Sequence, residues 1–132
     1  MADPKIFLTK IKNDEGPYDN DPKDAGKETV WGISRVEDPE WEGWPVVDNY
    51  RQLPNFPENL RNPEIDALVD KFYIKKYLTP IRYMEINDQD EADSLANDYV
   101  NRYSVAIKTQ QESIGVPQTG VMDDATINAL NS

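Results

Sequence analysis

A turn-rich stretch of twenty residues limits the fold of this chain more than any other part of its sequence. The stretch, EGPYDNDPKDAGKETVWGIS, runs from residue 15 to residue 34 and has almost no apolar periodicity. Gly16-Pro17 and Asn20-Asp21-Pro22 break a helix, whereas Thr29-Val30-Trp31 favours an extended chain. We therefore expect turns and a short β-hairpin here, between parts of the chain that are patterned for helices.

Two of the predicted helices begin at a capping residue followed by proline. Asp3-Pro4 precedes apolar residues at helical spacing, and the helix is expected to run to about Asp14, with Glu15 at its C-terminal end. Asn62-Pro63 gives the same signal for an amphipathic helix that ends near Tyr77. The segment from residue 35 to residue 62 is rich in proline and tryptophan and predicts only a short helix, at 45–53.

The C-terminal part of the sequence predicts three more helices. Asp88 and Glu91 form a capping pair for the strongest pattern, which continues to Tyr103. Ser104 is expected to cap a helix that ends at Gly115, and Asp123 or Asp124 to cap a last one through Leu130. The prediction is a mainly α (α+β) fold with one irregular or β-hairpin lobe after the first helix.

Composition excludes several classes of function. The chain has 132 residues, enough for one compact domain, and it contains neither cysteine nor histidine. A disulfide framework, a Cys/His zinc site and an imidazole base are therefore excluded. The formal net charge of −11 argues against a nucleic-acid partner. No targeting segment of the Sec type and no apolar run of membrane-spanning length is found, so no membrane partner is expected.

Glu15 is the first candidate for catalysis, because carboxylates are the main catalytic groups that remain. At a helix C-terminus it faces the negative end of the helix dipole, which disfavours its ionised form and suits it to act as a general acid. Asp24 lies nine residues further on and Thr29 five beyond it. An acid, a second carboxylate and a hydroxyl suffice for glycoside hydrolysis. Ordinary solvated turns have the same composition, and the spacing alone does not decide between the two interpretations.

The same stretch resembles the signature of the glycoside hydrolase 108 family, Glu-Gly-Gly-Tyr … Asn-Asp-Pro-x-Asp-x-Gly-Gly-x-Thr-x-x-Gly-Ile. These proteins are N-acetylmuramidases of phage endolysins and bacterial lysis systems, with a lysozyme-like fold. The matching positions are Glu15, Gly16, Tyr18, Asn20, Asp21, Pro22, Asp24, Gly26, Thr29, Gly32 and Ile33. The resemblance implies Glu15 as general acid and Asp24 and Thr29 as the residues that hold the water. Pro17 and Lys27 replace family glycines; proline fixes φ and lysine disfavours a positive φ.

The resemblance continues through most of the chain. KFYIKKYLTPIR matches a family segment at Tyr73, Tyr77 and Ile81, with Leu78 in place of a tryptophan. Residues 85–132 resemble the family's peptidoglycan-binding region through Asp98, Asn101, Gln110, Gly115, Gly120, Thr126 and Leu130. We therefore expect a single lysozyme-like domain over 1–132, with a catalytic lobe at 1–84 and a helical peptidoglycan-binding region at 85–132. The expected substrate-binding residues are Tyr18, Asn20, Asp98 and Asn101.

The resemblance implies a peptidoglycan hydrolase that cleaves the β-1,4 bond between N-acetylmuramic acid and N-acetylglucosamine. The alternative is a non-catalytic lysozyme-like binding or structural module of a phage or secretion apparatus. No cofactor or metal is expected. The expected partners are peptidoglycan and an inhibitor or phage or secretion-apparatus protein, and the expected state is a monomer. It would be made in the bacterial cytoplasm and act on the cell wall after delivery by a holin, a virion or a secretion apparatus.

Overall fold

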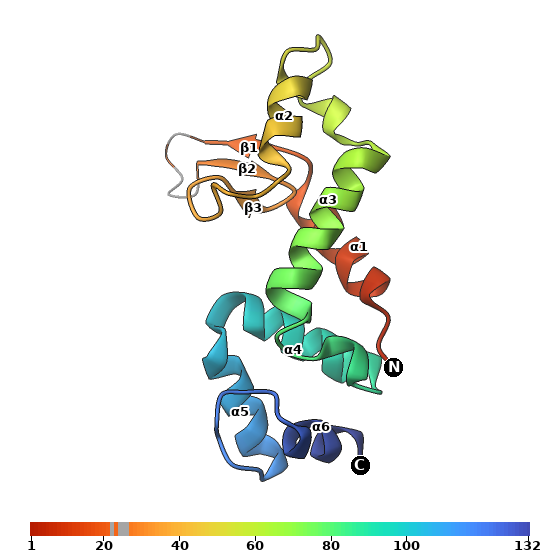
Figure 1. Cartoon of the computed structure of the whole chain (residues 1–132), viewed down its shortest axis with the longest axis vertical. Coiled ribbons are helices and arrows are strands. Elements are labelled where there is room, and N and C mark those ends of the chain that lie inside the picture. The colour runs from red at the N-terminus through yellow and green to blue at the C-terminus, as the bar shows by residue number, and fades with distance from the viewer. Residues whose placement is uncertain (22, 24–26) are drawn as a thin grey trace. The chain divides into compact units, whose positions relative to one another are not determined.

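The computed structural model describes residues 1–21, 23 and 27–132, and this part of the chain contains helices and one small sheet (Figure 1). The mainly α, α+β fold expected from the sequence is confirmed. The helices are α1 (Pro4–Glu15), α2 (Trp44–Arg51), α3 (Pro63–Tyr73), α4 (Gln89–Arg102), α5 (Ser104–Ile114) and α6 (Asp124–Asn131). The strands are β1 (Asp19–Asn20), β2 (Glu28–Val30) and β3 (Ile33–Ser34). Short helical turns lie at η1 (Glu58–Leu60), η2 (Ile74–Leu78) and η3 (Tyr83–Glu85).

Capping side chains begin three of the helices as predicted. The Asp88 carboxylate accepts a hydrogen bond from the Glu91 N–H at 2.8 Å, and the Asp123 carboxylate accepts one from the Thr126 N–H at 2.9 Å. The Asn62 amide oxygen caps α3 through the Ile65 N–H at 3.0 Å. Each bond satisfies a helix-end donor that would otherwise lack a partner.

Two helix ends differ from prediction. Ser104 is the first residue of α5 and not its cap; Tyr103 precedes the helix with φ 51°, and its side chain makes no capping bond. The α-helix that starts at Pro63 ends at Tyr73 and continues to Leu78 as a π-helical turn, η2. The short helix expected at 45–53 is α2, which begins one residue earlier and ends two residues earlier.

The predicted hairpin is part of a three-stranded antiparallel sheet of order β1-β2-β3. Asp19 pairs with Thr29 and Asn20 with Glu28, while Val30 pairs with Ile33 across the β2–β3 turn. That turn consists of Trp31 and Gly32 alone, at φ 48° and φ 83°. Positive φ at both positions is typical of the two-residue hairpin turns whose twist matches the strands.

The chain divides into two compact units, of which the first comprises residues 8–72. Its core is built on three buried tryptophans, whose indole N–H groups donate to backbone carbonyls. Trp31 donates to Leu60, Trp41 to Leu68 and Trp44 to Asp38. These contacts tie the irregular segment at 35–62 to the rest of the unit. Trp31, Trp41 and Trp44 are therefore core residues of this unit.

The second unit comprises residues 1–7 and 73–132. Its N-terminal residues are held by Tyr83, which is fully buried and whose hydroxyl donates to the Asp3 carbonyl and contacts Asp93. Gln111, also fully buried, donates to Val121 O and Thr126 Oγ1, each at 2.9 Å, and so holds the loop before α6. Among the described residues, no helix has the length and apolar character needed to cross a membrane. The single-domain prediction, with lobes at 1–84 and 85–132, stays a prediction.

Candidate active site

Glu15 is the last residue of α1, and its side chain is exposed. The glycine that follows ends the helix: Gly16 has φ 72°, and its N–H donates to the Lys12 carbonyl at 3.1 Å. This left-handed ending is a common helix C-terminus and suits glycine. Within the described part of the chain, no hydrogen bond or ion pair engages the Glu15 carboxylate. Its carboxylate is thus presented to solvent at the point where the chain leaves α1 for the sheet.

The sheet separates the other predicted site residues onto two faces. Residues directly opposite each other in a sheet share a face, and successive residues alternate. Thr29 therefore lies on the face of its partner Asp19, whereas Asn20 shares the other face with Glu28. Tyr18 belongs with Asn20 and Glu28, because the Asn20 amide donates to the Tyr18 hydroxyl at 3.4 Å. The structure thus brings Tyr18 and Asn20 together and places Thr29 on the opposite face.

Glu28 is the centre of a network of charged groups that sequence reasoning missed. Its carboxylate accepts from the Tyr18 hydroxyl and from Arg51, both at 2.6 Å, and from Arg35 at 3.1 Å. Asp48 joins the two arginines: both terminal nitrogens of Arg35 lie 2.9 Å from its two oxygens, and Arg51 lies 3.3 Å away. The network fastens β2 to α2 on the face that carries Tyr18 and Asn20.

The network fixes the ionisation of its members. Burial of Glu28 opposes its ionisation, but hydrogen bonds from Tyr18, Arg51 and Arg35 outweigh that effect and hold its pKa below the ordinary value. The bidentate contact with Arg35 lowers the pKa of Asp48 likewise. Burial, and then the bond to Glu28, raise the pKa of Tyr18. Glu28 is therefore an anion that orders the sheet, whereas Glu15 is unengaged.

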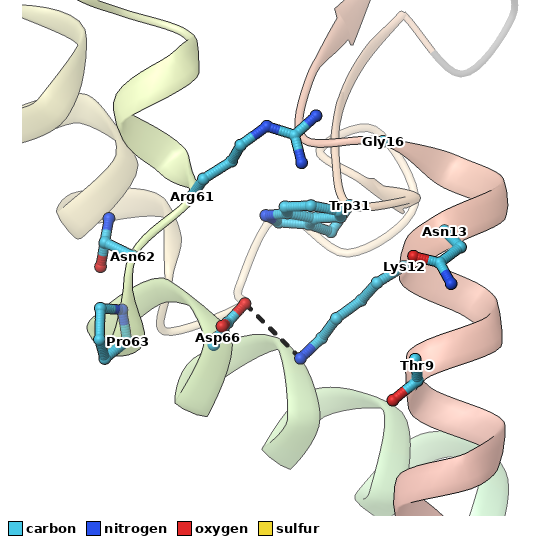
Figure 2. Close-up of a pocket in the computed structure, with 9 residues that line it drawn as sticks. All are labelled: Thr9, Lys12, Asn13, Gly16, Trp31, Arg61, Asn62, Pro63 and Asp66. Atoms are coloured by element: carbon cyan, nitrogen blue, oxygen red, sulfur yellow. Dashed lines mark ion pairs between the residues drawn. The ribbon is translucent and has the colours of Figure 1, made fainter.

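A cavity of about 570 Å³ lies beside Gly16, the residue that follows Glu15 (Figure 2). It is lined by Thr9, Lys12, Asn13, Gly16, Trp31, Arg61, Asn62, Pro63 and Asp66. The Lys12 ammonium lies 2.6 Å from Asp70 and 3.6 Å from Asp66, and the Arg61 guanidinium lies 5.3 Å from the centre of the Trp31 ring. Glu15 is not among the lining residues.

The remaining predicted site residues are placed as follows. Asp24 lies outside the described residues. Asp98 is on α4, where it forms two 2.6 Å contacts with Arg102 one helical turn later; the hydrogen bond from Arg102 lowers the pKa of Asp98. Asn101 is exposed on the same helix, and its amide donates to the Asn97 carbonyl at 3.0 Å. Both belong to the second unit, whereas Glu15, Tyr18, Asn20 and Thr29 belong to the first.

The structure combines six helices and one small antiparallel sheet in the described residues, with an exposed glutamate at the end of the first helix. These features are consistent with a lysozyme-like α+β protein. The sequence model of the family described as Glycosyl hydrolase 108 matches residues 8–102. The chain belongs to this family. Membership assigns it to the glycoside hydrolases and indicates peptidoglycan as the polymer on which it acts, at the bacterial cell wall.

A solved structure shows the same fold. SagA of Brucella abortus superimposes with a TM-score of 0.67 at 22% sequence identity, over 96% of this chain and 67% of that protein. A search of curated proteins gave no match. The family match ends at Arg102, so the resemblance of the C-terminal region to a peptidoglycan-binding segment stays a prediction.

Proposed function

We propose that this protein is an N-acetylmuramidase that hydrolyses the β-1,4 bond between N-acetylmuramic acid and N-acetylglucosamine, with Glu15 as general acid. The observation that carries the proposal is the position of Glu15, exposed and unengaged by the described residues at the end of α1, within the family match. A carboxyl group in that position is available to the oxygen of a bound glycan. Glu28, by contrast, already bonds three other side chains.

In the proposed reaction, Glu15 protonates the leaving glycosidic oxygen as the bond to the anomeric carbon breaks. Asp24 accepts a proton from a water molecule, whose oxygen bonds to that carbon from the opposite face, and the Thr29 hydroxyl holds this water. The product then has inverted configuration, and the two carboxyl groups should lie about 6.5–9.5 Å apart. A product with retained configuration would contradict this role of Asp24. Tyr18, Asn20, Asp98 and Asn101 are proposed to contact the glycan.

The C-terminal region is proposed to help hold peptidoglycan, and the protein is proposed to work as a monomer. It would reach the wall through a holin, a virion or a secretion apparatus, with an inhibitor or an apparatus protein as its partner. The non-catalytic binding module remains the alternative outcome of the test below.

The test compares the wild type with Glu15→Gln on isolated Gram-negative sacculi, with the released and reduced muropeptides identified by mass spectrometry. The wild type should release fragments that end in reduced N-acetylmuramic acid. Loss of a general acid typically costs about a hundredfold to ten-thousandfold in rate, and we expect a loss in that range. Asp14→Asn is the matched control, because Asp14 is the neighbouring exposed carboxylate on α1, and its variant should remain active.

Two results would refute the proposal. Fragments that end in reduced N-acetylglucosamine would show that the other glycosidic bond is cleaved. If the folded wild type releases nothing at any pH or ionic strength, the binding module is the better explanation.

A further inference from the structure

The cavity beside Trp31 has groups of both charges that the proposed mechanism does not use. Its volume of about 570 Å³ is within the range of small-molecule sites. Apart from Gly16, Pro63 and the Trp31 ring, its lining consists of hydroxyl, amide and charged side chains. Arg61 and Asp66 are its most exposed charges, at 56% and 50% of the side chain.

The negative charge of Asp66 is only partly balanced by Lys12, its partner in the cavity lining. The Lys12 ammonium is only 2.6 Å from Asp70, which does not line the cavity, and 3.6 Å from Asp66. Because Coulomb attraction falls with distance, the positive charge of Lys12 is matched mainly by Asp70. The Asp66 carboxylate is left able to receive a cationic group.

Arg61 presents the complementary charge. Figure 2 shows its guanidinium beside the Trp31 ring, and its Nε donates to Glu58, an exposed residue outside the cavity lining. This contact engages one edge of the guanidinium, and no other described side chain bonds its terminal nitrogens, which can therefore bind an anionic group. A guanidinium can bind a carboxylate through two parallel bonds, so this geometry suits a carboxylate ligand.

Trp31 forms the wall between these charges at a conformational cost. Its φ of 48° lies in the left-handed region, which is unfavourable for a residue other than glycine. The tight β2–β3 turn and the bond from its indole N–H to the Leu60 carbonyl hold it there. Backbone held in such a conformation is concentrated at functional sites.

We propose that this cavity binds the end of a peptidoglycan stem peptide, specifically an amino-acid end that carries both an ammonium and a carboxylate. Its ammonium pairs with Asp66 and its carboxylate with Arg61, beside Trp31. Lys12, Arg61, Asp66 and Asp70 together carry no net charge, so a ligand with both charges fits better than a simple anion. The inference rests on the proposed function, because it takes peptidoglycan as the source of the peptide.

The experiment titrates the ¹⁵N-labelled protein with the tripeptide L-alanyl-γ-D-glutamyl-diaminopimelate and follows the three indole N–H resonances by NMR. We expect the Trp31 resonance to shift, with Trp41 and Trp44 as internal references. Loss of one charge-assisted hydrogen bond at a half-exposed site should weaken binding about tenfold. Asp66→Asn, Arg61→Gln and acetylation of the peptide's side-chain amino group should each have this effect.

Matched controls come from the same helix. Glu64→Gln and Lys71→Gln change the charge of exposed residues of α3 that do not line the cavity, and both should bind like the wild type. The inference is overturned if the peptide leaves the Trp31 resonance unmoved at millimolar concentration, if chitotriose moves it equally well, or if Asp66→Asn and Arg61→Gln bind like the wild type.

Peptide binding does not require glycan cleavage, so the two proposals fail separately. Binding without muropeptide release from sacculi would support this site and refute the muramidase. Release without binding would refute this site and support the muramidase.

Discussion

Lys27 occupies a backbone position that suits glycine. Lysine disfavours a positive φ, yet the structure places Lys27 at φ 52°. Lys27 is therefore held in the left-handed conformation at the expense of strain. Such strain costs roughly 1–2 kcal/mol, of which the greater freedom of glycine in the unfolded chain offsets about half.

Lys27→Gly should accordingly raise the free energy of unfolding by about 0.5–1 kcal/mol. Chemical denaturation measures this change. Lys27→Ala is the control, since alanine keeps the Cβ atom and with it the strain. An equal gain in Lys27→Ala would show that removal of a positive charge, and not relief of strain, is the cause.

Glu28 should make the stability of the protein depend on acid pH. In the folded protein the pKa of Glu28 is lower than its ordinary value of 4.5. The contribution of the ionised carboxylate to the free energy of unfolding is therefore complete above pH 4.5, and it is lost as the pH falls through the lower pKa of the folded state. Glu28→Gln leaves Arg51 and Arg35 with fewer partners and should lower the free energy of unfolding by about 1–2 kcal/mol at pH 7, allowing for partial exposure.

Denaturation of the wild type and Glu28→Gln should be measured from pH 7 down to about pH 3. We expect the difference between them to shrink below pH 4.5. A difference that stays constant over this range would mean that the charge of Glu28 contributes nothing and that only its shape matters. Glu64→Gln is a suitable control, because Glu64 is exposed and its carboxylate, among the described residues, bonds Tyr50 alone.

Local sequence patterns were sufficient to predict where these helices start, but contacts between residues far apart in the sequence could not be predicted. Asp88, Asp123 and Asn62 mark helix starts because each bonds an N–H three residues away, so sequence alone reveals the cap. Glu28 bonds Arg51, which lies 23 residues away in the sequence, and no local pattern predicts that contact. Its only sequence signal is the spacing of Asp48 and Arg51, which are neighbours on one helix face. The role proposed for Glu15 comes from its motif, whereas the cavity at Trp31 could not be predicted because it requires α1, α3 and the β2–β3 turn together.

The segment at 35–62 has a packing role that one glycine makes possible. A Cβ atom at Gly43 would lie 2.3 Å from the ring of buried Trp41, which itself contacts Trp44 edge-on at 5.1 Å. The backbone angles of Gly43 are ordinary, so the close approach of the ring is the reason for glycine here.

Gly43→Ala should therefore lower the free energy of unfolding by about 1–3 kcal/mol, as overpacking of a core does. The loss should be much smaller in a Trp41→Leu background, because the ring that collides with the new methyl group is then absent. A double-mutant cycle by denaturation measures both steps. Equal losses in the two backgrounds would mean that the ring is not the obstacle.

The net charge of the protein should govern how it approaches peptidoglycan. The chain carries a formal net charge of −11, and peptidoglycan is itself rich in carboxylates. Their repulsion reaches about 30 Å at 0.01 M salt but only about 8 Å at 0.15 M. Muropeptide release from sacculi should consequently rise as salt increases over this range, because screening lets the protein approach the wall.

The same salts must be tested for their effect on the fold, since screening also relieves repulsion within the protein. Thermal unfolding at each ionic strength provides that control. A gain in release at temperatures where the protein is fully folded in every buffer belongs to the encounter with the polymer. Release that falls steadily from the lowest salt would mean that local positive groups such as Arg61 and Lys12 dominate the approach, and that net charge does not.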